Sequence, residues 1–130
     1  MYEKTTHSIT IQVKPSFLPD QSRPEEEHYE WAYHVRIENN GNEIVQLISR
    51  YWKIIDGHGD THEVEGEGVI GQQPTLAPGE SFEYTSGTPL GTPGGIMTGT
   101  YRMNSIHGHS FTVDIPSFSL DSPYQHNIIH

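Results

Sequence analysis

The 130-residue sequence contains no cysteine, and this absence removes a whole set of chemical functions. Without thiols there is no disulfide scaffold, no cysteine-ligated zinc, no iron–sulfur cluster and no cysteine nucleophile. The fold must therefore be held by packing, and a chain of this length is long enough for one domain with one core. We expect residues 1–130 to form a single domain.

Positive charge is also scarce. Seven Lys and Arg residues stand against seventeen Asp and Glu residues, which gives a formal net charge of −10 at pH 7. A field of this sign repels the phosphate backbone, so we expect no nucleic-acid partner. A cation, or a protein with a basic face, suits this charge better.

Long apolar runs are missing as well. No stretch approaches the roughly twenty apolar residues that a membrane-spanning helix needs. The N-terminal region also lacks the basic start and apolar stretch of a secretory signal. We therefore expect a cytoplasmic protein with no membrane association.

The sequence does contain many short segments in which large apolar residues alternate with polar ones, as in a strand with one buried face. The alternating segments are 9–13, 29–38, 97–103 and 111–115. Residues 44–55 are apolar on both faces and predict a central strand, and 61–65 and 82–84 predict short strands. Glycine and proline interrupt the stretches between them, which excludes helices longer than two turns. The pattern predicts an all-β fold, an antiparallel β-sandwich of about seven or more strands.

The large-residue faces of these segments predict the core, and Val64 is expected to point inward as well. The predicted core includes Trp31, Val35, Ile37, Leu47, Phe82, Tyr101, Phe111 and Val113. The polar, proline-bearing segment 121–130 is expected to be a flexible tail.

Several ordered motifs resemble the ApaG family, also called CorD, over nearly the whole chain. The most recognisable are Gly66-Glu67-Gly68-Val69-Ile70-Gly71-Gln72-Gln73-Pro74, Pro78-Gly79-Glu80-Ser81-Phe82-Glu83-Tyr84-Thr85-Ser86-Gly87 and Met97-Thr98-Gly99-Thr100-Tyr101-Arg102-Met103. Shorter matches are Ser22-Arg23-Pro24-Glu25, Ile37-Glu38-Asn39, Val45-Gln46-Leu47, Arg50-Tyr51-Trp52 and Ile115-Pro116-Ser117-Phe118.

The resemblance implies an immunoglobulin-like or fibronectin type III-like β-sandwich, in bacteria usually a free-standing cytoplasmic protein. Similar domains in eukaryotes are attached to F-box proteins and to a polymerase-delta-interacting protein, where they look like interaction modules. Bacterial members are associated with cobalt tolerance and magnesium efflux. The resemblance therefore favours a binding module with a link to divalent-cation homeostasis, whose partner is a protein or a small ligand.

The spacing Gly66-x-Gly68-x-x-Gly71 matches the dinucleotide fingerprint, but the prolines that follow exclude the helix that the fingerprint needs. Two interpretations remain. The loop is a candidate anion site, in which backbone N–H groups of Gly66, Gly68 and Gly71 surround a phosphate. Otherwise the glycines serve the fold through positive φ and close packing. The first leaves open a nucleotide or pyrophosphate sensor or enzyme, since bacterial genes of this family often neighbour a diadenosine tetraphosphate hydrolase.

Nine histidines raise a second alternative, direct metal binding by acidic and His-rich loops. Asp56, His58, Asp60 and His62 occupy every second position, so in an extended strand all four side chains would point the same way. His107 and His109 are further candidate ligands. Asp-Gly and His-Gly pairs are ordinary turn formers, so the residues need not converge. We assign no metal site and no cofactor.

The sequence carries no signature of catalysis. Neither Gly-x-Ser-x-Gly nor His-Glu-x-x-His is present, and no nucleophile stands beside a recognisable base. We expect no catalytic residue and no enzymatic activity. The edges of the predicted sheets would permit a homodimer.

Overall fold

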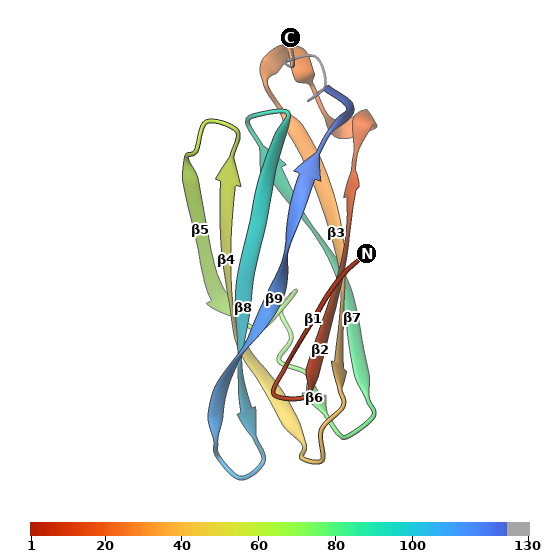
Figure 1. Cartoon of the computed structure of the whole chain (residues 1–130), viewed down its shortest axis with the longest axis vertical. Helices are drawn as coiled ribbons and strands as arrows, with labels where there is room; N and C mark the ends of the chain where they lie inside the picture. The colour runs from red at the N-terminus through yellow and green to blue at the C-terminus, as the bar shows by residue number, and fades with distance from the viewer. Residues whose placement is uncertain (125–130) are drawn as a thin grey trace.

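The computed structural model describes residues 1–124, which form a β-sandwich of two antiparallel sheets (Figure 1). The strands are β1 (Tyr2–Thr6), β2 (Ile9–Phe17), β3 (Tyr29–Asn39), β4 (Val45–Asp56), β5 (Thr61–Glu67), β6 (Thr75–Leu76), β7 (Ser81–Leu90), β8 (Gly94–Ser105) and β9 (Ser110–Asp121). One sheet has the order β1-β2-β3-β7 and the other the order β5-β4-β8-β9, with β6 paired to the start of β4. The all-β prediction is confirmed, and β1 and β6 are additions to the predicted strands.

Alternation of side chains decides which face of each strand is buried. In β3, every second residue from Tyr29 to Asn39 is buried and the residues between them are not. Antiparallel pairing then aligns Val35 with Val13 of β2 and with Tyr84 of β7, so that large residues share one face of the sheet. The apolar faces of the two sheets pack against each other and form a single core.

Most of the predicted core is confirmed. Trp31, Val35, Ile37, Leu47, Tyr101 and Val113 are buried. Phe82 and Phe111 are only partly buried, contrary to expectation. Each lies near the start of an edge strand, β7 or β9, where the opposite sheet covers it incompletely.

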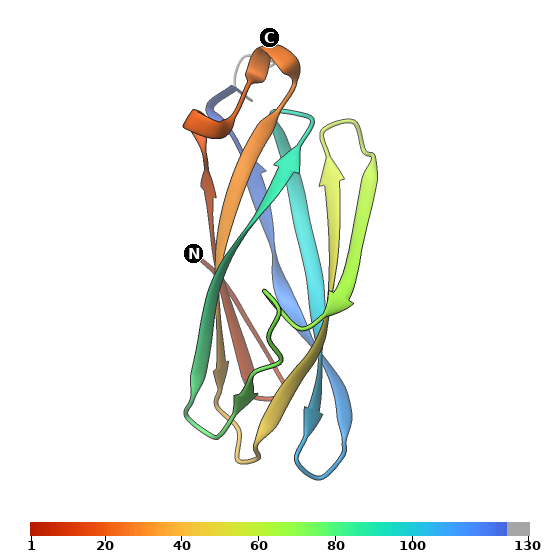
Figure 2. The same ribbon diagram turned by 180° about the vertical axis from the view of Figure 1, so that it is seen from behind.

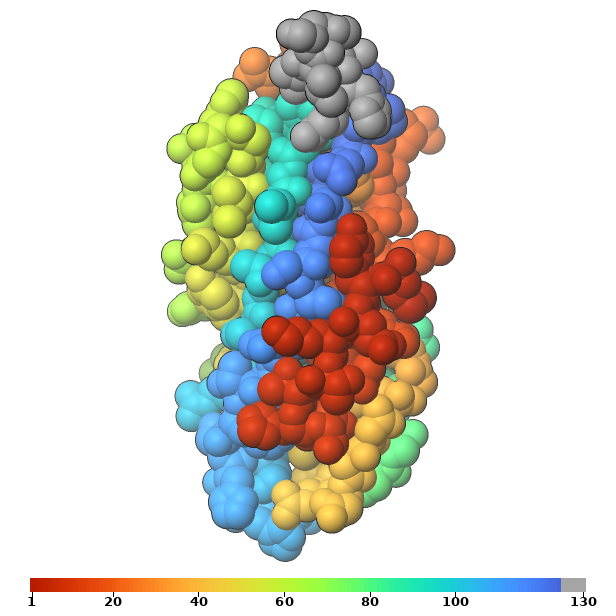
Figure 3. All heavy atoms as spheres, in the orientation of Figure 1, coloured from red at the N-terminus to blue at the C-terminus, as the bar shows by residue number. Residues whose placement is uncertain are grey.

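One side of the sandwich is closed by contacts between β1 and β9. The ring centroids of Tyr2 and Phe118 lie 5.9 Å apart. The Lys4 ammonium pairs with the Asp114 carboxylate at 3.1 Å, and the Asp114 backbone N–H donates to Thr6 Oγ1 at 3.2 Å. Figure 3 shows the N-terminal residues lying directly on β9.

The opposite side is open, because β5 extends beyond the edge of β7 (Figure 2). Val64 pairs with the buried Trp52 and so lies on the inner face, as predicted, yet its side chain is 43% exposed. The prediction that Val64 is inward is correct for its direction, but no strand of the other sheet covers it.

Helical structure in the described residues is limited to two short 3-10 turns, Pro19–Gln21 and Pro24–Glu26. None of the helices in this part of the chain has the length and apolar character of a membrane span. Of the predicted tail, Asp121 instead ends β9, and the buried Ser122 donates its backbone N–H to Pro93 O at 3.1 Å. Residues 125–130 of that prediction lie outside the described residues.

Candidate functional site

The glycine-rich segment leaves the end of β5 and makes a tight turn before β6. Val69 and Gln72 exchange both backbone hydrogen bonds, at 2.8 and 2.9 Å, across the two turn residues. Gly68 has φ 63° and Gly71 has φ 77°, so the predicted need for positive φ is met at two of the three glycines. A Cβ added to Gly68 would lie 2.2 Å from the backbone oxygen of Gln72, and this contact excludes larger residues.

Most backbone N–H groups of this turn are already used within the fold. Besides the exchange between Val69 and Gln72, the Gly68 N–H donates to Ile48 O at 2.8 Å. A phosphate nest needs successive N–H groups that all point toward the ligand. Gly68 and Gly71 therefore shape the chain here, and the segment offers few free amides to an anion.

Gly66 has a different role, which is to make room for the side chain of Arg50. A Cβ at this position would lie 2.8 Å from both terminal nitrogens of the Arg50 guanidinium. Arg50 Nη1 also donates to the backbone oxygens of Glu67, at 3.1 Å, and Gly68, at 2.9 Å. The guanidinium thus lies flat against the glycine segment.

A bulge in β4 turns Arg50 toward the inside of the sandwich. The pairing of β4 with β8 shifts register between Leu47 and Ser49, so that Ile48 is the extra residue. Beyond the bulge, Arg50 lies opposite the buried Tyr101 and therefore on the inner face. Simple alternation from Leu47 would have placed Arg50 on the outer face.

Three tyrosines, Tyr33, Tyr84 and Tyr101, lie on the inner face near Arg50, and the hydroxyl groups of Tyr84 and Tyr101 are hydrogen-bonded to each other. Burial raises the pKa of all three phenols, and the Arg50 charge only partly opposes this effect. The phenols therefore stay neutral at physiological pH and cannot balance the guanidinium. None of the ion pairs among residues 1–124 includes Arg50.

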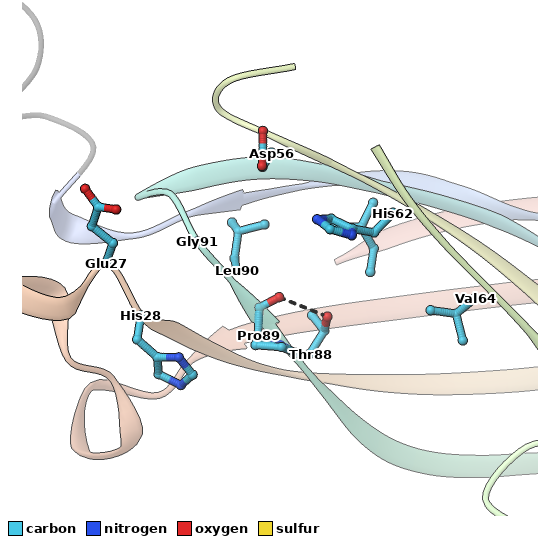
Figure 4. A pocket seen from close by; sticks show the side chains of 10 residues that line it. Glu27, His28, Asp56, His62, Val64, Thr88, Pro89, Leu90 and Gly91 are labelled. Atoms are coloured by element: carbon cyan, nitrogen blue, oxygen red, sulfur yellow. Dashed lines mark hydrogen bonds between the residues drawn. The ribbon is translucent and has the colours of Figure 1, made fainter. Parts of the chain in front are cut away.

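A groove of about 410 Å³ runs along the open side, between the end of β7 and the overhanging strand β5 (Figure 4). Its lining residues are Glu27, His28, Ile54, Asp56, His62, Val64, Thr88, Pro89, Leu90 and Gly91. Figure 4 shows Glu27 and His28 at one end of the row and Val64 at the other. Apolar residues along the groove are accompanied by the Asp56 carboxylate and the His62 imidazole, and His62 lies between Leu90 and Val64 in Figure 4.

The same opening continues toward Arg50 as a smaller hollow of about 210 Å³. The two hollows share Ile54, Val64 and Thr88. The residues that line the smaller one are Tyr33, Arg50, Trp52, Ile54, Val64, Ser86, Gly87, Thr88 and Met97. We call the two hollows together the β5/β7 groove.

The candidate metal ligands do not converge. Asp56 Oδ1 accepts the backbone N–H groups of His58, at 2.8 Å, and Asp60, at 3.0 Å, and so stabilises the β4–β5 turn. His62 lies on the inner face of β5 beside the groove. In the described part of the chain, no three His, Cys, Asp or Glu side chains are grouped as ion ligands.

His107 and His109 are at the other end of the molecule. They lie in the turn that follows Ser105, and Ser105 pairs with Val45 at the start of β4. Asp56 is at the far end of the same strand. The two groups of histidines therefore cannot share one ion.

Arg50, Trp52 and the exposed inner face of β5 are the features of this site that the sequence did not reveal. One signal was available for Arg50, which is a charged residue inside a segment rich in large apolar residues, although Lys53 has the same property. For β5 the sequence showed a strand, but not that it would lack a facing neighbour.

Comparison with known proteins agrees with this architecture. The family model DUF525, described as the ApaG domain, matches residues 19–105. The chain is 58% identical to Protein ApaG of Parvibaculum lavamentivorans over 130 residues, the full length of both proteins. It is 56% identical to Protein ApaG of Rhodospirillum centenum over 124 residues, 95% of each. The ApaA protein of Bordetella pertussis has a similar crystal structure, with a TM-score of 0.87 and 50% identity over 92% of this chain and 97% of that one. The chain belongs to the ApaG family.

Proposed function

We propose that this chain is a cytoplasmic, non-catalytic binding module that takes an extended segment of a protein partner along β5. The observation that carries the proposal is the uncovered inner face of β5. Val64 lies on the face that should be buried, beside Trp52, but is 43% exposed and lines a groove of about 410 Å³. Addition of a strand to β5 would cover Val64 and extend the sheet.

The edge of β5 is suited to such pairing. β5 is the end strand of its sheet, and each of its residues except Gly66 is exposed. An unpaired strand edge presents free N–H and C=O groups to another chain. The edge of β7 across the groove is a poorer template, because Pro89 in that strand has no N–H.

Charge indicates the chemistry of the partner. The outer face of β5 carries Glu63, Glu65 and Glu67 in a row, and only Glu63 is opposite a cation, Lys53. A bound strand would place its alternate side chains against this row, where lysine or arginine suits both the glutamates and the net charge of −10. The side chains between them would be apolar and point into the groove.

The same row of glutamates disfavours a second copy of this chain as the partner, since two β5 edges would bring like charges together. We further propose that the family's link to divalent cations is exerted through the bound protein. The turn role of the Asp56 carboxylate and the separation of the histidines support this form of the proposal.

A model peptide tests the proposal. The probe is a seven-residue peptide of alternating lysine and valine, titrated into the ¹⁵N-labelled protein while amide shifts are followed. We expect shifts along 61–67 and 88–91, and weaker binding as salt is raised. A peptide of the same composition, with the lysines and valines in two blocks, controls for plain charge attraction.

Two variants make the test specific to the groove. Val64→Asp should abolish the shifts. Ile96→Asp is the matched control, since Ile96 is 47% exposed but lies on β8 outside the groove lining. Equal binding of the two peptides, or equal loss in the two variants, would contradict the proposal.

A further inference from the structure

Arg50 has hydrogen-bonding capacity that the described residues do not use. Its Nη1 donates to Glu67 O and Gly68 O, while Nε and Nη2 have no acceptor among residues 1–124. A guanidinium carries five N–H donors, and one edge of it can bind both oxygens of a carboxylate. The free edge belongs to a side chain that lines the inner end of the β5/β7 groove.

A second unused donor belongs to Trp52, a residue that lines the same hollow. Trp52 is 2% exposed, and its indole Nε1 has no hydrogen-bond partner among the described residues. Trp52 lines the hollow together with Arg50 and Ser86, and Ser86 lies beside the Tyr33 hydroxyl. The indole N–H is itself inaccessible, so an acceptor supplied from outside the chain would meet the donors of Arg50 and not Trp52 Nε1.

The charges around the hollow favour a bound group that carries a single negative charge. Arg50 is the cation of this hollow, whereas Glu65 and Glu67 stand nearby on the outer face of β5. A phosphate dianion would need more positive charge than one guanidinium provides. A carboxylate matches the guanidinium in both charge and planar geometry.

The register of β5 places this carboxylate relative to the rest of a bound segment. The inner face of β5 is formed by His62, Val64 and Gly66, and Gly66 is opposite Arg50. A strand paired with β5 would direct every second side chain inward, so the residue at the level of Gly66 would lie over the guanidinium. Because Gly66 has no side chain, the approach to Arg50 is open.

We propose that Arg50 is a specificity-determining residue that binds the carboxylate of an acidic side chain, two positions from an apolar residue, in the segment that pairs with β5. The inference rests on the proposed function. The expected partner segment then contains one acidic residue whose side chain points into the groove, in addition to its basic and apolar residues. Gly66 then also has a function, which is to seat the guanidinium.

Peptide pairs test this inference. Starting from the alternating lysine–valine peptide, one inward valine, at the second or the sixth position, is replaced by glutamate or by glutamine. The two positions cover both strand directions. We expect one glutamate peptide to bind about tenfold more tightly than its glutamine counterpart, as measured by calorimetry. Arg50→Gln should remove this difference, and Arg50→Lys, which keeps the charge but loses the planar fork, should reduce it to about threefold.

Gly66→Ala tests whether the position of the Arg50 guanidinium matters for binding, because the variant moves this group without removing its charge. The added Cβ would lie 2.8 Å from both terminal nitrogens, and this flexible side chain can shift while the fold is kept. We expect loss of the glutamate preference with an unchanged amide spectrum away from 50 and 66. Arg102→Gln is the matched control, because Arg102 Nε binds Ser110 Oγ at 3.0 Å on the outer face. That variant should keep the full preference.

The outcomes distinguish the two proposals. If no alternating peptide binds the native protein, the proposed function fails. If the peptides bind but glutamate and glutamine are equal, only the carboxylate assignment is overturned, and Arg50 is left as an anchor of the glycine segment. A glutamate preference that persists in Arg50→Gln overturns it as well.

Discussion

The two sides of this sandwich differ in how the edges of the two sheets are joined. On each side the edges of the two sheets come near each other. On the β1/β9 side, an aromatic contact, an ion pair and a hydrogen bond close the edge. On the β5/β7 side, no hydrogen bond or ion pair among residues 1–124 joins the two strands, and a groove remains. The inner face of the sandwich is therefore covered on the β1/β9 side and left partly open on the β5/β7 side, where Val64 is 43% exposed.

The largest expected effect comes from the closed side. Phe118 is 2% exposed and its ring contacts those of Tyr2, Tyr33 and Trp52. Phe118→Ala should lower the free energy of unfolding by about 3–5 kcal/mol. Val64→Ala on the open side should cost about 0.5 kcal/mol or less, because Val64 is already 43% exposed. Urea titration checks both. Similar losses in the two variants would show that Val64 is packed as tightly as Phe118.

A smaller effect is expected at the turn below the open side. Gly68→Ala should cost about 2–3 kcal/mol, because φ is 63° and the new Cβ would meet Gln72 O at 2.2 Å. Gly71→Ala should cost less, about 1 kcal/mol, since φ is 77° but the space is open. Thermal unfolding gives the order. If Gly71→Ala were the worse variant, close packing would not be the reason for glycine at 68.

The phenols between the two sides predict a loss of stability at alkaline pH. Burial raises the pKa of Tyr84 and Tyr101 above 10.0, so the folded state keeps protons that the unfolded state loses above this pH. The free energy of unfolding is therefore fully retained below pH 10 and falls as pH rises beyond it, by about 1.4 kcal/mol per pH unit for each phenol.

Tyr84→Phe should make this alkaline slope shallower by one phenol. At pH 7 the variant should lose only about 1 kcal/mol, from the hydrogen bond with Tyr101. Urea titrations between pH 9 and pH 11.5 give the slope. An unchanged slope would mean that Tyr84 ionises normally in the folded protein.

The smallest expected effect is again on the closed side. Lys4 and Asp114 are 3.1 Å apart, but their side chains are 53% and 46% exposed. Lys4→Gln should change the free energy of unfolding by about 0.5 kcal/mol or less, and less still in high salt. A larger, salt-sensitive loss would show that charge, and not the Tyr2–Phe118 contact, holds this side together.

The fold could be predicted because its strands have clear two-residue alternation and its connections are rich in glycine and proline. β1 was missed because Tyr2–Thr6 has no apolar alternation and is a strand only through its pairing with β2. The burial of Phe82 and Phe111 was predicted to be greater than it is, because alternation gives the direction of a side chain but not how much the other sheet covers it.

The candidate site was harder to predict for two physical reasons. The bulge at Ile48 reverses the alternation of β4, so a period of two places Arg50 on the wrong face. The groove depends on the relative widths of the two sheets, which is a property of topology and not of any one segment. The prediction of positive φ in the glycine segment is confirmed at Gly68 and Gly71, whereas the close approach of Arg50 to Gly66 was not predicted.

The seal between β1 and β9 also sets an order of events during synthesis. Thr6 and Asp114 are 108 residues apart, so β1 is made roughly 5 to 20 seconds before its last neighbour at ordinary translation rates. During that interval β1 can pair only with β2, through the turn at His7 and Ser8, and the Tyr2 ring has no Phe118 to cover it. In the nascent chain β1 therefore lacks its contacts with β9 until β9 leaves the ribosome. The β5/β7 side of the sandwich can form before the β1/β9 side does.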